Sequence, residues 1–185
     1  MALTAANVRV GVTGAVYVAP IATALPDDAT TSLIAAYEDV GYIHEDGVTE
    51  TQDTDTNDII AWQNGATVRK VQTNHDLMYQ FTMLETSEVT LREYYGNFAE
   101  AGSVGAGDPA DDKVVIDGAE LPNRRWVLSV LDGIHTLRIV IPDGQVTERG
   151  DITYANDDAV GREVTITCYP DTNGNKAYIY MDDTE

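Results

Sequence analysis

The chain has 185 residues, a length that suits one domain, and we expect a single domain over residues 1–185. The 11 Lys and Arg residues against 31 Asp and Glu residues give a net charge of −20, which argues against nucleic-acid binding, because phosphate recognition needs a basic surface. Cys168 is the single cysteine, which excludes an intrachain disulfide, and no stretch approaches the ~20 apolar residues that cross a bilayer, so we expect no membrane association.

Period-two alternation dominates the chain and begins with a run of valines from Val8 to Val18. This pattern predicts a half-buried strand, in which Gly11 and Gly14 suggest a bulge or a close backbone approach. The following segment, 20–38, is rich in Ala, Thr and Asp and contains two prolines, which favours a loop.

A second alternating run, from Leu77 to Met83, predicts a strand that leads directly into the best helical signal of the sequence. Ser87 is a suitable N-cap, Glu88 lies in the first turn, and Gly96 is a natural stop. We therefore expect one short amphipathic helix packed on a sheet.

The segment 101–112 is rich in Gly and Ala and is expected to be a flexible linker. After it, Asp132 and Gly133 separate two alternating runs, and this dipeptide favours a type I′ hairpin turn. In the register that this turn implies, Leu131 lies opposite Ile134.

The last two alternating runs, 164–168 and 177–181, are separated by turn residues and predict a final hairpin. Many antiparallel strands with one helix indicate a mainly β fold, an antiparallel β-sandwich or barrel with one short flanking α-helix.

Candidate chemistry is sparse. The segment 53–58 begins like a calcium loop, but Asp58 and Asn64 stand where an EF-hand needs Gly and a bidentate Glu. The three histidines lie in separate segments, and no nucleophile elbow or phosphate loop is present. We expect no catalytic site, no metal site and no cofactor.

Three segments carry a resemblance to a known family: the opening 6–20, the central signature 39–50 continuing through 58–69, and the stretch 80–86 with its helix. They resemble the tail tube proteins, also called major tail proteins, of long-tailed bacteriophages (siphophages), and in particular those that infect actinobacteria. The likeness covers most of the first hundred residues.

The resemblance implies a structural protein that forms hexameric rings, which stack into the tail tube through which the genome is delivered. It implies other tail proteins as partners, such as the tape measure, tail tip and terminator, and DNA that passes through the lumen without specific binding. The place implied is the phage tail of the virion, after assembly in the host cytoplasm.

A long polar segment, about 41–65, is not needed for a compact core, and such segments are usually functional or disordered. We interpret it as an assembly loop and name as candidate interface residues Tyr42, Asp46, Asp53, Asp55, Asp58 and Trp62. Trp62 is also open to an interpretation as a core residue, because large aromatics are often buried in their own chain. The alternatives for the whole protein are a tail terminator, a head decoration protein or a calcium-dependent β-sandwich binding module.

Overall fold

The computed structural model describes residues 8–96, 114, 116, 118–156 and 159–182. The predicted linker 101–112 lies outside them. The elements follow in the order β1 (Thr13–Pro20), β2 (Glu38–Asp39), β3 (Ile43–Ile60), β4 (Thr67–Met83), α1 (Glu88–Tyr95), β5 (Arg124–Asp132), β6 (His135–Arg149), β7 (Arg162–Cys168) and β8 (Tyr178–Asp182). The fold is mainly β with one short helix, as the sequence predicted.

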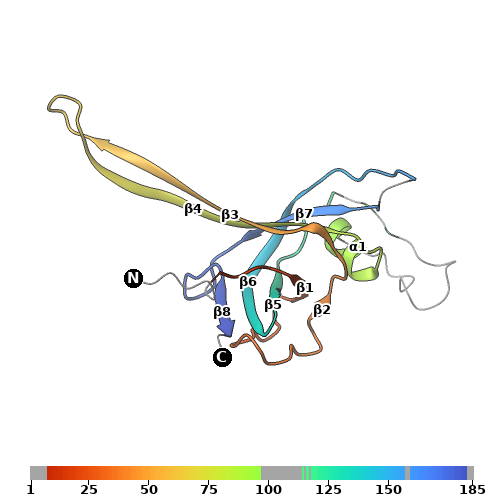
Figure 1. Ribbon diagram of the computed structural model, residues 1–185. Coiled ribbons are helices and arrows are strands. Elements are labelled where there is room, and N and C mark those ends of the chain that lie inside the picture. Colours follow the sequence, from red (N-terminus) through yellow and green to blue (C-terminus); the bar gives the residue numbers. More distant parts are fainter. Residues whose placement is uncertain (1–7, 97–113, 115, 117, 157–158, 183–185) are drawn as a thin grey trace.

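All strand pairs are antiparallel, and the sheet order is β2-β1-β5-β6-β7-β4-β3, with β8 added on β6. Strand β6 is long enough to serve two neighbours, because its residues 136–140 pair with β8 and its residues 144–149 pair with β7. The path ends at β2 and β3 without closing into a barrel (Figure 1).

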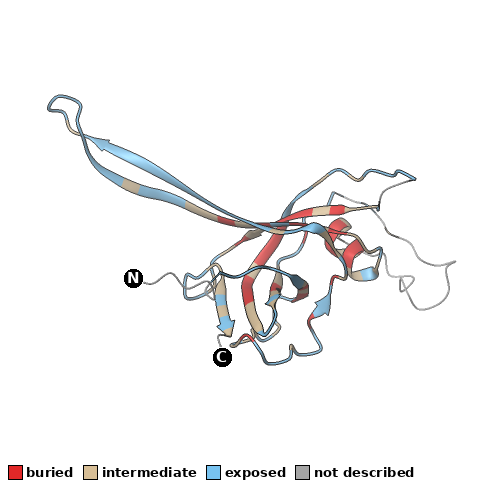
Figure 2. Cartoon of the chain, in the orientation of Figure 1, coloured by how far each residue is buried: buried red, intermediate tan, exposed pale blue. Residues whose placement is uncertain are grey.

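The main core lies between the inward faces of β1, β5 and β6 and those of β4 and β7, with Tyr94 of α1 at its side. Trp126 of β5 and Phe81 of β4 meet edge to face, with ring centroids 6.1 Å apart. A smaller cluster on the opposite face of β5 and β6 contains Val127 and Val140. Both faces of these two strands are therefore covered, which is consistent with a sandwich (Figure 2).

The helix begins and ends where the sequence predicted. The side chain of Ser87 accepts a hydrogen bond from the Thr90 amide, and the Thr90 hydroxyl accepts one from the Ser87 amide. Gly96 follows the helix with a φ of 96°, a positive value that Gly adopts without a steric penalty.

The predicted register of the β5–β6 hairpin is wrong by two residues. Asp132 pairs with His135 and Leu131 with Thr136, so the two turn residues are Gly133 and Ile134. Gly133 has a φ of 62° at the first turn position, where a type II′ turn requires a positive φ. A shift of two residues leaves every side chain on its predicted face.

The predicted final hairpin is also wrong, because β7 and β8 do not pair with each other. Each instead pairs with a different part of β6, and β7 also pairs with β4 on its other side.

The first strand begins at Thr13, later than predicted, and Val8, Val10 and Val12 are exposed.

Candidate assembly interface

The polar segment that the sequence analysis interprets as a long loop is mostly a β-strand. β3 and β4 form one hairpin, paired from Val48 and Phe81 at its base to Ile60 and Thr67 near its end. Trp62, Gln63, Asn64 and Gly65 close it, with Asn64 and Gly65 both at a positive φ and the Ala61 amide donating to the Ala66 carbonyl. The loop interpretation of 41–65 is corrected accordingly.

The hairpin has a buried base and an exposed outer half. At the base, β4 pairs with β7 from Met78 to Met83, and its inward residues Tyr79 and Phe81 are 1% and 2% exposed. From Leu77 outward to the hairpin end, β3 is the only strand among the described residues that pairs with β4. All residues from 49 to 60 are exposed. Figure 1 shows this half projecting away from the body, and eight residues of strand span roughly 25 Å.

A hydrogen bond fixes the base of the hairpin. The Tyr79 hydroxyl donates to Glu50 Oε2 at 2.9 Å, from the strand opposite. Burial, and then the bond to Glu50, raises the pKa of Tyr79 well above its usual range, so this hydroxyl keeps its proton and remains a donor. On the neighbouring side, Lys176 donates to the carbonyl of His75 and lies 3.5 Å from an Asp76 carboxylate oxygen.

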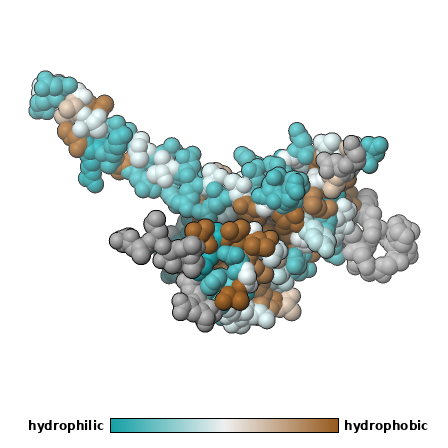
Figure 3. Space-filling model, in the orientation of Figure 1, coloured by the Kyte–Doolittle hydropathy of each residue, from teal (hydrophilic) through white to brown (hydrophobic). Residues whose placement is uncertain are grey.

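The end of the hairpin carries an apolar group that we call the tip: Ile59, Ile60, Trp62 and Val68. Their side chains are 46%, 61%, 98% and 63% exposed, respectively. We call the projecting outer half of the hairpin the arm. Figure 3 shows hydrophobic side chains gathered near its far end, while the rest of the arm is mostly hydrophilic. The exposure of Trp62 rules out its interpretation as a core residue of its own chain.

The structure distributes the six predicted interface residues along the hairpin rather than gathering them at one point. Tyr42 precedes β3 and is 77% exposed, and an Asp46 carboxylate oxygen lies 2.9 Å from His44 Nδ1 in the irregular start of the strand. Asp58 lies near the tip, 3.4 Å from Lys70. Trp62 lies in the tip itself.

Asp53 and Asp55 lie on one face of the outer half. Asp53 is directly opposite Asp76, and Asp55 is opposite Asn74. Like charges in directly opposed positions destabilise a strand pair, and Lys176, 3.5 Å from Asp76, offsets part of this repulsion. Sequence reasoning named Asp53 and Asp55 but missed Asp76, because only the register shows that it shares their face.

The calcium-loop interpretation of 53–58 does not fit the structure. The segment is extended strand, so its carboxylates are spread along the hairpin, whereas a calcium loop wraps its oxygens around one point. Among the residues that the structure describes, no group of three or more His, Cys, Asp or Glu is placed to hold a metal ion.

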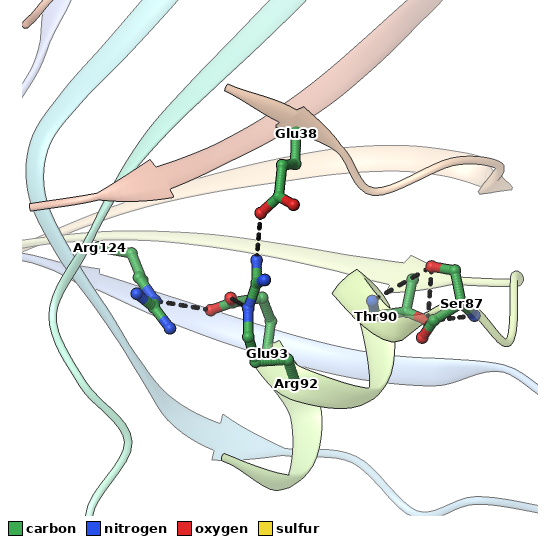
Figure 4. A network of polar contacts seen from close by, with 6 residues as sticks. All are labelled: Glu38, Ser87, Thr90, Arg92, Glu93 and Arg124. Atoms are coloured by element: carbon green, nitrogen blue, oxygen red, sulfur yellow. Dashed lines mark hydrogen bonds and ion pairs between the residues drawn. The ribbon is translucent and has the colours of Figure 1, made fainter. Parts of the chain in front are cut away.

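A buried carboxylate holds α1 to the sheet. Glu93 is 4% exposed and lies 2.8 Å from Arg92 and 3.4 Å from Arg124 of β5 (Figure 4). Arg92 also contacts Glu38 of β2 at 2.6 Å. This network joins the helix to two strands, and sequence reasoning missed it because its members are far apart in the chain.

A hollow of about 550 Å³ lies between β1 and the start of β3. Its wall includes residues 11–16, the exposed Tyr42 and Asp46, and residues 128–130 of β5. The single helix in the described part of the chain is too short and polar to cross a membrane.

The fold and the arm define a class: a β-sheet protein whose extended hairpin, not a pocket, is its most prominent exposed feature. The chain matches the phage tail tube protein family over residues 1–185 and belongs to that family. It is therefore a structural protein of the phage tail, as the resemblance in the sequence implied.

Among solved structures, the chain is similar to the sheath/tube terminator of an extracellular contractile injection system, PVC, in its extended state. The identity is 8%, with 91% of this chain and 93% of that chain covered and a TM-score of 0.43. A chain in the virion of a native gene transfer agent particle has 8% identity, coverage of 81% and 92%, and a TM-score of 0.40. An Hcp protein has 11% identity, coverage of 92% and 98%, and a TM-score of 0.32.

These TM-scores are all below 0.5, so the likeness to the solved structures is loose. No curated protein sequence matches the chain.

Proposed function

We propose that this protein is the subunit of a phage tail tube, which assembles as hexameric rings stacked into the conduit for genome delivery. The projecting hairpin carries this proposal, because it exposes an apolar tip and a long strand edge that its own body does not cover. Tyr42, Asp46, Asp53, Asp55, Asp58 and Trp62 are the interface residues that we assign to it.

The unpaired edge of β3 suits contact between copies. β3 is the last strand of the sheet, so the backbone groups on its outer side have no strand partner among the described residues. Such an edge is a template for pairing with another chain. A two-stranded hairpin is also marginal on its own, and pairing in an assembly would stabilise it.

The proposed partners are other copies of this chain and the other tail proteins, such as the tape measure, tail tip and terminator. DNA would pass through the lumen without specific binding. The subunits would assemble in the host cytoplasm and function in the virion.

The alternative within the same class is a tail terminator, which would form one closed ring instead of a tube. Negative-stain microscopy of the concentrated protein, with sizing over a range of concentrations, separates the two. We expect long tubes of uniform width that dissociate on dilution. Single closed rings would favour the terminator, and a compact monomer under all ionic conditions would contradict both.

A further inference from the structure

The described part of the chain has a second exposed apolar surface, on the body. We call it the receiving patch, and it consists of Val10, Val130, His135, Leu137 and Met181, which line one hollow. Val10 is 58% exposed and Met181 69% exposed. Figure 3 shows hydrophobic side chains on the body below the arm as well as near its far end.

The sheet register explains why this patch exists. Val130 of β5 is opposite Leu137 of β6, which is opposite Met181 of β8, so three strands contribute to one row. In the next row, Leu128 and Ile139 are 2% and 8% exposed and belong to the main core. The apolar face of the sheet therefore continues past the part that β4 and β7 cover.

The hollow in the receiving patch has a volume of about 170 Å³ and a mostly apolar wall. Asp132 and Asp182 line it together with Arg9. Asp132 accepts a hydrogen bond from the Val10 amide at 3.0 Å, which fixes its position at the edge. An apolar side chain that is accompanied by a cation would suit this surface.

The hairpin end has that composition. Trp62 projects from the tip, and Arg69 and Lys70 follow directly in β4, both exposed. Lys70 is paired with Asp58, whereas Arg69 forms no ion pair within the part of the chain that the structure describes. Trp, Arg and Met are among the residues enriched in the centres of protein interfaces.

We propose that the tip of one copy docks in the receiving patch of a second copy, with Trp62 against Met181 and Leu137 and Arg69 near Asp132. The inference rests on the proposed function, since it names the surfaces through which subunits meet. The tip projects away from its own body, so it contacts another copy (Figure 1). The two surfaces differ, and a head-to-tail contact of this kind propagates instead of closing as a dimer.

Cysteine cross-linking between differently marked copies tests the contact. Gln63→Cys places a thiol next to Trp62 and keeps the anchor, and Met181→Cys places one in the receiving patch. The native Cys168 is 0% exposed, and burial raises the pKa of its thiol to about 12, so it does not compete. The two variants are mixed, assembled into tubes and oxidised, with the exposed Thr51→Cys at the base of the hairpin as the matched control for Gln63→Cys.

We expect a disulfide-linked dimer that contains one copy of each variant and at least about tenfold less product with the Thr51→Cys control. Trp62 emission should also move to shorter wavelength on assembly, while the buried Trp126 gives a constant background. Tubes without the Gln63–Met181 product, or with equal product from the control, would overturn the inference and leave the proposed function standing. Absence of tubes from the unmodified protein would instead contradict the proposed function.

A substitution at the patch gives a second, independent measurement. Met181→Glu adds a charge beside Asp132 and Asp182 at a position that is already exposed, so the monomer should fold as before. We expect the protein concentration needed for assembly to rise at least about tenfold. Assembly at the original concentration would overturn the docking site.

Discussion

Glu93 is a buried charged residue that links the helix to the sheet. Its carboxylate lies between two guanidiniums and is 4% exposed, so it has little water to compensate for the loss of either partner. A buried ion pair is weak evidence for net stability, but removal of one partner leaves an uncompensated buried charge.

We therefore expect Glu93→Ala to lower the free energy of unfolding by about 3 kcal/mol, because Arg124 would lose the carboxylate that it shares with Arg92, and Arg92 would keep only Glu38. Chemical denaturation of the dilute monomer measures this effect. Glu88→Ala, on the exposed first turn of the same helix, is the matched control and should cost only a few tenths of a kcal/mol. Equal losses from the two variants would show that Glu93 does not anchor the helix.

Cys168 offers a readout of the core. Burial raises its thiol pKa to about 12, so only about one molecule in ten thousand holds a thiolate at pH 8. We expect a thiol-reactive dye at pH 8 to label the native protein far more slowly than the unfolded chain, at a rate set by opening of the core. Rapid labelling of the native protein would mean that the β4–β6–β7 core is looser than the structure shows.

At the scale of elements, the tip of the hairpin has a different role from the residues of the core. Trp62 is 98% exposed, so we expect Trp62→Ala to change the free energy of unfolding by less than about 0.5 kcal/mol. The same change should raise the concentration needed for assembly about tenfold or more, because exposed aromatics are common interface anchors.

Thermal unfolding and sedimentation of assembled tubes measure the two effects separately. Thr56→Ala, an exposed position on the same arm, controls for general changes to the strand. If Trp62→Ala prevents folding of the monomer, Trp62 stabilises its own chain. If the variant assembles at the same concentration as the unmodified protein, Trp62 is not an interface residue.

The strands and helix of the body could be predicted because they obey local rules. The run from Leu77 to Met83 alternates as a half-buried strand must, and Ser87 and Gly96 mark the two ends of the helix. The pairing of β6 with both β7 and β8 could not be predicted, because a long strand that serves two neighbours leaves no local signal.

The outer half of the hairpin was missed for a different reason. Its strand, 49–60, is almost entirely polar and has no apolar period, since neither face is covered by its own body. Period-two reasoning detects burial on one face, so a strand exposed on both faces looks like a loop. The available signals were Asn64-Gly65, a strong turn dipeptide, and the four threonines at positions 49, 51, 54 and 56.

At the scale of the whole molecule, the structure shows where some of the few basic side chains lie. Arg138 is 7% exposed and donates to the carbonyls of Asp28 and Thr31, and Arg162 is 5% exposed and donates to the carbonyl of Glu85. These guanidiniums serve backbone groups inside the fold. Meanwhile Asp53 and Asp55 are exposed on the arm, so the surface is more acidic than the composition alone indicates.

In the tube that we propose, this distribution would give the acidity a function. A lumen lined with Lys and Arg would bind phosphates through counterion release and slow the passage of the genome, whereas an acidic wall repels them. With a net charge of −20 per subunit, we expect no detectable DNA binding even at low salt, and more Asp and Glu than Lys and Arg on the lumen wall of an assembled tube. Gel shifts at low ionic strength and a structure of the tube measure these two outcomes. If the carboxylates lie mainly on the outside, their role is solubility of the tube, and tight, salt-sensitive DNA binding or a basic lumen would refute the idea.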